Sequence, residues 1–266
     1  MKLFSPAKLN LFFRVLKKRE DGFHEVASLM QALSFGDTLH FSWSKEDQIT
    51  STDPNLPLDE RNFVHQARTL FRKKTGIAWP LSIHIEKQIP IEGGLGGGSS
   101  NLATTLWAMN QMAEAQIETQ TLQEWAGELS SDAPFFFSSG TAYVTGRGEK
   151  VASLTPLPAK EVTLAKPIGE GLSTPLIYRH CAPDPIGDPK KILEGELPPR
   201  NDLELPAFNL RSRLKKLKEE LLSLGYDEVR MTGSGTTFFC FGAVERPALS
   251  GVNFWKTSFL ERTPEW

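Results

Sequence analysis

Hydrophobic residues follow two different rhythms along this chain. Alternation of apolar and polar residues, which is typical of a strand with one side on a core, occurs over residues 7–16 and 81–86. A further apolar stretch over 26–41 suggests more sheet. Apolar residues at helical spacing predict helices over 62–74, 102–109, 122–129 and 208–224. The pattern of the first half therefore predicts a mixture of strands and helices, in which the strand over 81–86 is followed by two successive helices.

The second half of the chain predicts a separate set of elements. Prolines interrupt the pattern near residue 155, and we expect a boundary there between two lobes, 1–155 and 156–266. The second lobe predicts a strand over 162–165 and, over 229–242, two strands joined by a Gly-Ser-Gly turn. Polar or proline-bearing segments predict loops over 45–61 and 183–199. Without an internal repeat, this mixture indicates an α+β fold.

The segment from Pro90 to Ser100 carries five glycines in six residues and runs directly into a predicted helix. Such a loop has few side chains to hold a ligand away, so its backbone N–H groups can close around a phosphate at the positive end of the helix. The segment lacks the lysine of G-x-x-x-x-G-K-[ST], and the chain contains no G-x-G-x-x-G. A flexible turn with a serine cap would explain one glycine and one serine, not five glycines. The sequence therefore predicts a phosphate site of another kind.

Four further segments carry polar residues whose role the pattern leaves open. Lys8 and Asn10 share one face of a predicted strand, which a solvated strand face would also explain. Asp132 precedes an Ala-Pro step and is either a helix cap or a carboxylate positioned to take a proton. Residues 231–237 are explained by a hairpin turn. His24 follows an aromatic ring and is either structural or suited to a flat heterocycle.

Composition and charge narrow the class of partner. Thirty basic and 32 acidic side chains give a formal charge of −2, so no overall basic field indicates a nucleic-acid or membrane partner. No apolar run approaches the ~20 residues that span a bilayer, and the N-terminus lacks the apolar core of a signal peptide. Cys181 and Cys240 lack metal spacing and predict free thiols. We expect a soluble cytoplasmic protein.

Three segments together resemble the GHMP family of small-molecule kinases, in the family's order. Residues 5–11, Ser-Pro-Ala-Lys-Leu-Asn-Leu, resemble its first motif, residues 90–101 its phosphate-binding motif and residues 231–236 its third motif. The similarity runs from about residue 5 to the Gly-Ser-Gly turn. It implies a two-lobed α+β fold with an N-terminal ATP-binding lobe, similar to domain 2 of ribosomal protein S5, and a C-terminal α/β lobe. The active site would lie in the cleft between the lobes.

The resemblance implies a role for each motif residue on the ATP side. Lys8 and Asp132 match the family's catalytic pair, in which the carboxylate accepts the proton of the substrate hydroxyl and the lysine orients that hydroxyl. Asn62 and Lys87 match positions that contact adenine or its ribose. Mg²⁺ would accompany ATP, with Ser99 or Ser100 as a possible ligand. The residues that would wrap the ATP phosphates are Pro90, Ile91, Glu92, Gly93, Gly94, Leu95, Gly96, Gly97, Gly98, Ser99 and Ser100.

The acceptor side is similar to family members that phosphorylate a cytidine diphosphate sugar alcohol. The motifs that carry this likeness are Ala-Lys-Leu-Asn-Leu-Phe, Asp-Gly-Phe-His-Glu and the glycine run ending in Ser-Ser-Asn. The likeness implies that His24 recognises cytosine, that Phe23 and Tyr178 stack on its two faces, and that Asn10 and Thr174 contact the substrate. The alternatives are a kinase of the same family acting on mevalonate, homoserine or a sugar, and a nucleotide-binding member without catalytic activity.

Three residues depart from the family pattern. Phe23 stands where tyrosine is usual, so stacking is retained and any bond from the hydroxyl is lost. Glu92 occupies a position of the phosphate loop that is commonly glycine, where a carboxylate is unfavourable unless it points outward or meets Mg²⁺. Ser131 replaces an alanine beside Asp132. Because none of these changes removes a member of the catalytic pair, we expect activity.

Overall fold

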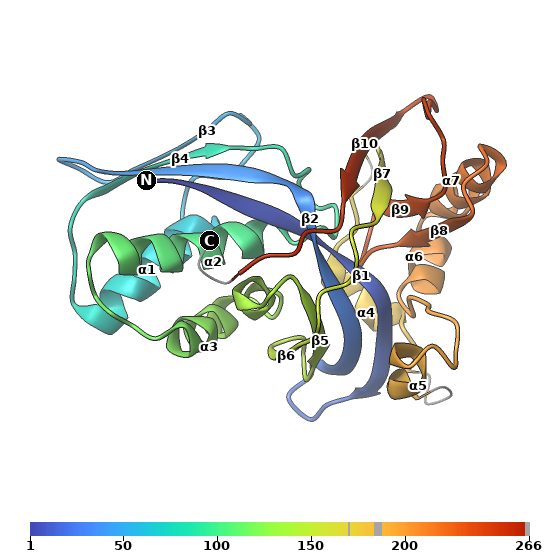
Figure 1. Cartoon of the computed structure of the whole chain (residues 1–266), viewed down its shortest axis with the longest axis horizontal. Helices are drawn as coiled ribbons and strands as arrows, with labels where there is room; N and C mark the ends of the chain where they lie inside the picture. Colours follow the sequence, from blue (N-terminus) through green and yellow to red (C-terminus); the bar gives the residue numbers. More distant parts are fainter. Residues whose placement is uncertain (170, 184–187, 264–266) are drawn as a thin grey trace.

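The structure, a computed structural model, describes residues 1–169, 171–183 and 188–263, which form two halves, each built on its own sheet (Figure 1). The elements of the first half are β1 (Lys2–Lys18), β2 (His24–Trp43), β3 (Gln48–Ser51), α1 (Phe63–Thr75), β4 (Leu81–Glu86), α2 (Gly97–Met112), α3 (Thr119–Leu129), the 3₁₀ helix η1 (Ala133–Phe137), β5 (Thr141–Thr145) and β6 (Lys150–Ser153). Those of the second half are β7 (Glu161–Pro167), α4 (Thr174–His180), α5 (Pro189–Leu193), α6 (Glu204–Leu210), α7 (Ser212–Ser223), β8 (Glu228–Met231), β9 (Phe238–Phe241) and β10 (Val252–Ser258).

The first sheet is organised around the long strand β2. Its strand order is β3-β4-β2-β5-β6, and β1 pairs with β2 in antiparallel register. That register shifts three times, between Pro6 and Lys8, between Asn10 and Phe12 and between Val15 and Lys17. Such irregularities bend a strand and re-aim its side chains, and they are common beside active sites. Two of them bracket the segment that carries Lys8 and Asn10.

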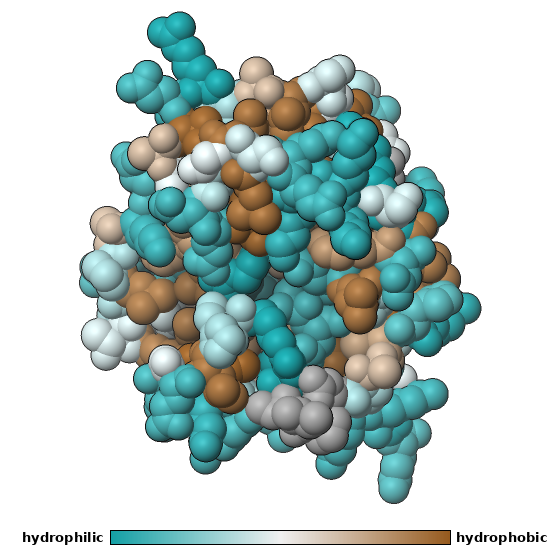
Figure 2. Space-filling model, turned by 90° about the vertical axis from the view of Figure 1, so that its right-hand side faces the viewer, coloured by the Kyte–Doolittle hydropathy of each residue, from teal (hydrophilic) through white to brown (hydrophobic). Residues whose placement is uncertain are grey.

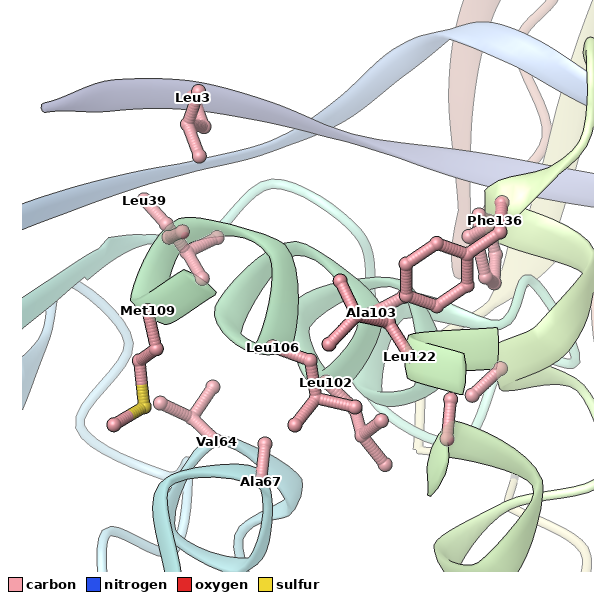
Figure 3. Packing of buried hydrophobic residues seen from close by; sticks show 14 of the residues in the cluster. Leu3, Leu39, Val64, Ala67, Leu102, Ala103, Leu106, Met109, Leu122 and Phe136 are labelled. Atoms are coloured by element: carbon pink, nitrogen blue, oxygen red, sulfur yellow. The ribbon is translucent and has the colours of Figure 1, made fainter. Parts of the chain in front are cut away.

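The core of the first half lies between this sheet and its helices. Figure 3 shows Leu3 and Leu39 on the sheet side of α2, with Val64 and Ala67 of α1 on the opposite side. Leu106 of α2 lies between them and is fully buried. Because α2 is covered on both sides, its first turn, which begins at Gly97 within the glycine-rich segment, is held in place.

The second half places helices against an antiparallel sheet of order β10-β7-β9-β8. Leu214, Leu217 and Leu221 recur at helical spacing along α7 and join the buried cluster beneath this sheet. Figure 2 shows the face of the molecule formed by this half: it is mainly hydrophilic, and its hydrophobic residues form small separate groups. The second half therefore has a core of its own and also packs against β1.

Both faces of β1 are buried, because the second half covers the face that the alternation pattern presents as polar. Arg14 is fully buried, with its Nε 2.8 Å from Oδ2 of Asp202. The backbone N–H of Asn10 donates to Oγ1 of Thr232 at 3.0 Å. The interpretation of Lys8 and Asn10 as a solvated strand face is therefore wrong. A local pattern cannot show that a segment some 200 residues away covers the strand.

The predicted strands and helices of the first half are confirmed, and so are β7, β8 and β9. Three other predictions are wrong. The predicted loop over 45–61 contains β3, and the predicted loop over 183–199 contains α5, although residues 184–187 lie outside the described residues. The single helix predicted over 208–224 is two helices, α6 and α7, separated by Arg211 at φ −143° and ψ 88°. The pattern missed β5, β6, β10 and α4, which are only four to seven residues long.

Three smaller expectations concern the whole chain. β6 ends at Ser153 and β7 begins at Glu161, and the lobe boundary near residue 155 stays a prediction. Cys181 and Cys240 are buried free thiols, as predicted. Among the described residues, no helix combines the length and the apolar character needed to cross a bilayer.

Candidate active site

Lys8 and Asn10 lie side by side on β1, almost completely buried. The ammonium of Lys8 donates to Oδ1 of Asn10 at 2.6 Å, and Nδ2 of Asn10 donates to Oγ of Ser28 at 2.8 Å. The exposed fractions of Lys8 and Asn10 are 2% and 1%. Since a buried ammonium is costly without partners, these bonds hold the lysine in one position. The two residues form a pre-oriented cationic group.

Asp132, the residue directly before η1, lies beside this cationic group. Its Oδ2 lies 3.3 Å from Nζ of Lys8, and its side chain is 35% exposed. Asp132 precedes η1, but its side chain makes no capping hydrogen bond. The helix-cap explanation therefore does not describe this carboxylate. Its position beside a buried ammonium, with one part open to solvent, is suited to accepting a proton from a bound hydroxyl.

The glycine-rich segment packs directly on these residues. The backbone N–H of Lys8 donates to the carbonyl of Leu95 at 2.9 Å. A Cβ on Gly96, whose φ is 72°, would lie 2.9 Å from Cγ of Lys8, and a Cβ on Gly94 would lie 2.4 Å from the carbonyl oxygen of Thr232. Glycine is required at both positions, by close approach as well as by the left-handed backbone. The part of the segment that precedes α2, up to its N-cap Gly96, thus fits between β1 and the Gly-Ser-Gly turn of the second half.

A pocket of about 360 Å³ opens along this loop, a size suited to a small-molecule ligand. Its walls come from the loop before α1, the end of β4, the glycine-rich segment and the first turns of α2 and α4. The lining residues are Leu56, Pro57, Arg61, Asn62, Phe63, Lys87, Pro90, Ile91, Glu92, Gly93, Gly94, Leu95, Gly96, Gly97, Gly98, Ser99, Asn101 and Thr174. Nearly all predicted ATP contacts therefore line one cavity. Ser100 is absent from the lining.

The structure gives two of the predicted ATP residues additional partners. Asn62 is the N-cap of α1: its Oδ1 accepts from the N–H of Val64 at 2.8 Å, and its Nδ2 donates to the carbonyl of Pro57 at 2.6 Å. Lys87 lies 3.0 Å from Asp37 and also donates to the carbonyl of Ile89. Burial lowers the pKa of Lys87, whereas the nearby Asp37 opposes that shift. Both residues are therefore tied into the wall of the pocket, and their contact with ATP stays a prediction.

Asp37 is a residue of this site that the sequence analysis missed. It is fully buried, and its Oδ1 accepts from the N–H groups of Gln88 and Ile89, both at 2.8 Å. Its Oδ2 accepts from Nδ2 of Asn101 at 2.9 Å. Asp37 thus joins the chain entering the glycine-rich segment to the helix that leaves it. No local signal distinguishes this aspartate, because its partners come from 50 to 64 residues further along the chain.

The two serines that open α2 differ in their surroundings. Ser100 is fully buried, and its Oγ accepts a hydrogen bond from Oγ of Ser5 at 2.8 Å. Oγ of Ser99 lies 2.8 Å from Oγ of Ser130, and Ser99 lines the pocket. Within the described residues, no three His, Cys, Asp or Glu side chains cluster as metal ligands would. Ser99 is therefore the serine that faces the pocket.

Glu92 has a left-handed backbone, with φ at 54°. Its carboxylate points across to the second half, because a Cβ on Gly171 would lie 2.4 Å from its Oε2. A side chain at such a φ is strained relative to glycine. The carboxylate thus lies at the edge of the pocket and is directed toward Gly171.

The residues predicted to contact cytosine form a second group, built from rings. The rings of His24 and Tyr178 are stacked, with centroids 5.1 Å apart and planes inclined by 26°. Burial, assisted by the negative charge of Asp132, raises the pKa of Tyr178 far above its ordinary value. The ring of Phe23 is 51% exposed, and the guanidinium of Arg147 lies 4.9 Å from its centroid. In this structure the partner of Tyr178 is therefore His24, and a base bound between Phe23 and Tyr178 stays a prediction.

Thr174 connects the two sides of the site. Its Oγ1 lies 2.8 Å from Oγ of Ser234, in the Gly-Ser-Gly turn, and it also lines the pocket beside the glycine-rich segment. The hairpin-turn explanation of residues 231–237 is thus incomplete. This turn packs against both Gly94 and Asn10 and forms one wall of the site.

Comparisons with known proteins agree with this arrangement. The family model of the GHMP kinases N terminal domain matches residues 62–140, and that of the GHMP kinases C terminal domain matches residues 187–259. The chain is 49% identical over 251 residues to 4-diphosphocytidyl-2-C-methyl-D-erythritol kinase of Protochlamydia amoebophila, covering 93% of this chain and 86% of the relative. A crystal structure of 4-(cytidine 5'-diphospho)-2C-methyl-D-erythritol kinase superposes with a TM-score of 0.79 at 31% identity, covering 97% of this chain and 99% of the other. Mevalonate kinase of Methanococcus jannaschii has the same fold, with a TM-score of 0.69 at 13% identity and 98% of each chain covered.

Proposed function

We propose that this chain, which belongs to the GHMP kinase family, transfers the γ-phosphoryl group of ATP to the 2-hydroxyl of 4-diphosphocytidyl-2-C-methyl-D-erythritol. The products are ADP and the 2-phosphate of the substrate, in the non-mevalonate route to isoprenoid precursors. The observation that carries the proposal is the set Lys8, Asn10 and Asp132 beside the glycine-rich pocket, in a chain similar over nearly its whole length to kinases of this name.

In the proposed reaction, Asp132 is the proton acceptor. The oxygen of the substrate hydroxyl attacks the γ-phosphorus, the bond from that phosphorus to the bridging oxygen breaks, and the hydroxyl proton passes to the Asp132 carboxylate. Lys8 orients the hydroxyl and offsets the negative charge that develops. Asn10 holds the ammonium through the 2.6 Å hydrogen bond to its Oδ1. Phosphoryl transfer depends mainly on positioning and on electrostatic stabilisation, which this set is suited to supply.

The glycine-rich segment is proposed to hold the phosphates through its backbone, with α2 directing its positive end toward them. Mg²⁺ fits this site as an ion carried by the ATP phosphates, because it retains waters and needs only one or two protein oxygens. Ser99 would hold it, since its side chain lines the pocket, whereas Ser100 is buried against Ser5. When bound, the ion offsets phosphate charge. The residues of the adenine end are proposed to be Asn62 and Lys87.

On the acceptor side, His24 is proposed to bind the cytosine edge, with Phe23 and Tyr178 on its faces and Thr174 beside the substrate. This side distinguishes the proposal from a kinase of mevalonate, homoserine or a sugar, because those acceptors have no base. The stacked rings of His24 and Tyr178 support it. Bases bind readily to aromatic side chains, and each stacking contact contributes ~1–3 kcal/mol.

The proposal is tested by incubating the purified protein with ATP labelled at the γ-phosphate and one acceptor at a time. We expect label to pass to 4-diphosphocytidyl-2-C-methyl-D-erythritol and not to mevalonate or homoserine. Equal transfer to mevalonate would exclude the proposed substrate. ATP binding without transfer to any acceptor would instead indicate a nucleotide-binding member without catalytic activity.

A further inference from the structure

Asn201 connects the strand that carries Lys8 and Asn10 to the Gly-Ser-Gly turn of the second half. Its Nδ2 donates two hydrogen bonds of 2.8 Å, to the carbonyl oxygens of Met231 and Gly233. Its Oδ1 accepts from the N–H of Leu203 at 2.9 Å. Asn201 is 7% exposed, and every polar atom of its amide is therefore directed at backbone inside the protein. Two of those three bonds hold the turn.

The backbone around Asn201 is fixed to β1. The N–H of Phe13 donates to the carbonyl of Arg200 at 2.9 Å, and the N–H of Asp202 donates to the carbonyl of Phe13 at 2.8 Å. Oδ2 of Asp202 also accepts from the N–H of Val15 at 2.9 Å. Residues 200–202 thus continue the hydrogen bonding of the strand only a few positions after Asn10. Asn201, whose own segment is paired with β1, therefore links the turn to the strand that carries Lys8 and Asn10.

Gly233, the residue that Asn201 holds, lies against those side chains. A Cβ on Gly233 would lie 3.1 Å from Oδ1 of Asn10, 3.4 Å from Nζ of Lys8 and 3.4 Å from the carbonyl oxygen of Gly94. The turn therefore touches both the cationic group and the phosphate loop. A shift of the turn would open space around the Lys8 ammonium and change its position relative to the phosphate loop.

We propose that Asn201 is a positioning residue of the transfer reaction: its two donated hydrogen bonds set the position of the Gly-Ser-Gly turn against Lys8, Asn10 and the phosphate loop. This inference rests on the proposed function for its kinetic part only. Asn201 touches neither substrate nor ATP and acts through Gly233. Misplacement of reacting groups by 1 Å can cost about 100-fold in rate. Because Gly233 lies against Lys8 and Asn10, the loss of the two hydrogen bonds that hold the turn is expected to lower the rate of transfer.

The test is Asn201→Asp, which keeps the shape and the acceptor for Leu203 but replaces the two donors by a charged oxygen facing two carbonyls. We expect kcat to fall about 10- to 100-fold, with a smaller change in KM for ATP, because the proposed adenine contacts, Asn62 and Lys87, are held by residues outside the turn. Amide hydrogen exchange of residues 231–237 should become faster. This second measurement needs no substrate, so it tests the inference even if the proposed acceptor is wrong.

Asn110 offers a matched control. It is 6% exposed, its Nδ2 donates to the carbonyl of Ile117 and its Oδ1 accepts from the same residue, both at 2.9 Å, far from the site at the end of α2. Asn110→Asp should lower the melting temperature while kcat stays at the wild-type value. If both variants lose kcat in proportion to their loss of stability, or if Asn201→Asp changes neither kcat nor the exchange of residues 231–237, the inference is wrong.

A second variant covers the case in which Asn201→Asp does not fold. Thr232→Val preserves shape and removes the acceptor for the N–H of Asn10, a 3.0 Å bond that joins the same turn to β1. Since it removes one bond in place of two, we expect the loss of kcat to be smaller, about threefold to tenfold. Wild-type kcat and wild-type exchange in this variant would contradict a positioning role for the turn.

Discussion

The two sides of the candidate site are built in different ways. The transfer centre is made of buried polar groups, with Lys8 and Asn10 only 2% and 1% exposed and held by hydrogen bonds. The proposed base side, formed by His24, Tyr178 and Phe23, is made of rings, and Phe23 at its edge is 51% exposed. Transfer needs charges in fixed positions, which burial and hydrogen bonding supply. A flat base needs faces to stack on, which the rings of His24, Tyr178 and Phe23 are suited to supply.

If the transfer centre depends on charge, Asp132→Asn should have the largest effect. Asparagine caps helices as well as aspartate does, so any role in capping η1 is kept, whereas the ability to accept a proton is lost. We expect kcat to fall about 100- to 10,000-fold with KM for ATP unchanged, measured by ADP release in the presence of the acceptor.

Asp188→Asn is the control for this variant, because Asp188 is a true N-cap whose side chain accepts from the N–H of Lys190 at 2.9 Å. It should leave kcat unchanged. A wild-type kcat in Asp132→Asn would mean that Asp132 is not the proton acceptor.

On the base side, the loss of His24 should weaken binding and leave the chemistry intact. His24→Ala removes both the proposed hydrogen-bonding ring and the ring that stacks on Tyr178. We expect KM for the cytidine-bearing acceptor to rise about tenfold, with kcat and KM for ATP little changed. His180→Ala, an exposed histidine on the same helix as Tyr178, should bind the acceptor normally. A fall in kcat as large as that of Asp132→Asn would remove the distinction between the two sides.

A smaller effect is expected at the edge of the phosphate loop. Glu92→Gly relieves the strain of a left-handed backbone at a residue with a side chain and removes a negative charge from the pocket wall. We expect KM for ATP to fall about threefold to fivefold. Glu114→Gly relieves a similar φ of 48° at the end of α2, outside the pocket, and should not change KM for ATP. An increase of KM in Glu92→Gly would show that its carboxylate assists binding.

The smallest effect expected is the contribution of His24 to the decrease in the protein's stability at acid pH. Burial lowers the pKa of His24 below its ordinary 6.5, and the charge of Lys18 adds to this. The unfolded chain therefore binds a proton here at a higher pH than the folded protein does. In that window stability rises with pH and is lost as the pH falls below 6.5. Between about pH 7.5 and 5.5 the melting temperature should fall more for the wild type than for His24→Ala. Equal slopes would show that His24 does not contribute.

Local sequence was sufficient for elements whose residues carry their own signal. The period-two pattern of β4 and the helical spacing of α1, with Asn62 as its cap, correspond to what the structure contains. It was not sufficient for β3, β6 and α5, which have four or five residues each, nor for the break at Arg211. In such short segments, packing against neighbouring strands and helices decides the backbone conformation. Four or five residues are too few to show a period of apolar positions.

The features of the candidate site also divide into those that local sequence indicated and those that only the tertiary structure revealed. The glycine run alone determined that a phosphate could bind, because close backbone approach and a following helix are local properties. Local residue types also marked Lys8, Asn10, His24 and Asp132 as candidates. Tertiary structure decided which candidates meet: it buried both faces of β1, brought Asp132 to within 3.3 Å of Lys8 and showed that Asp132 is no cap. Asp37 and Asn201 became visible only there, because hydrogen bonds between distant segments leave no pattern along the chain.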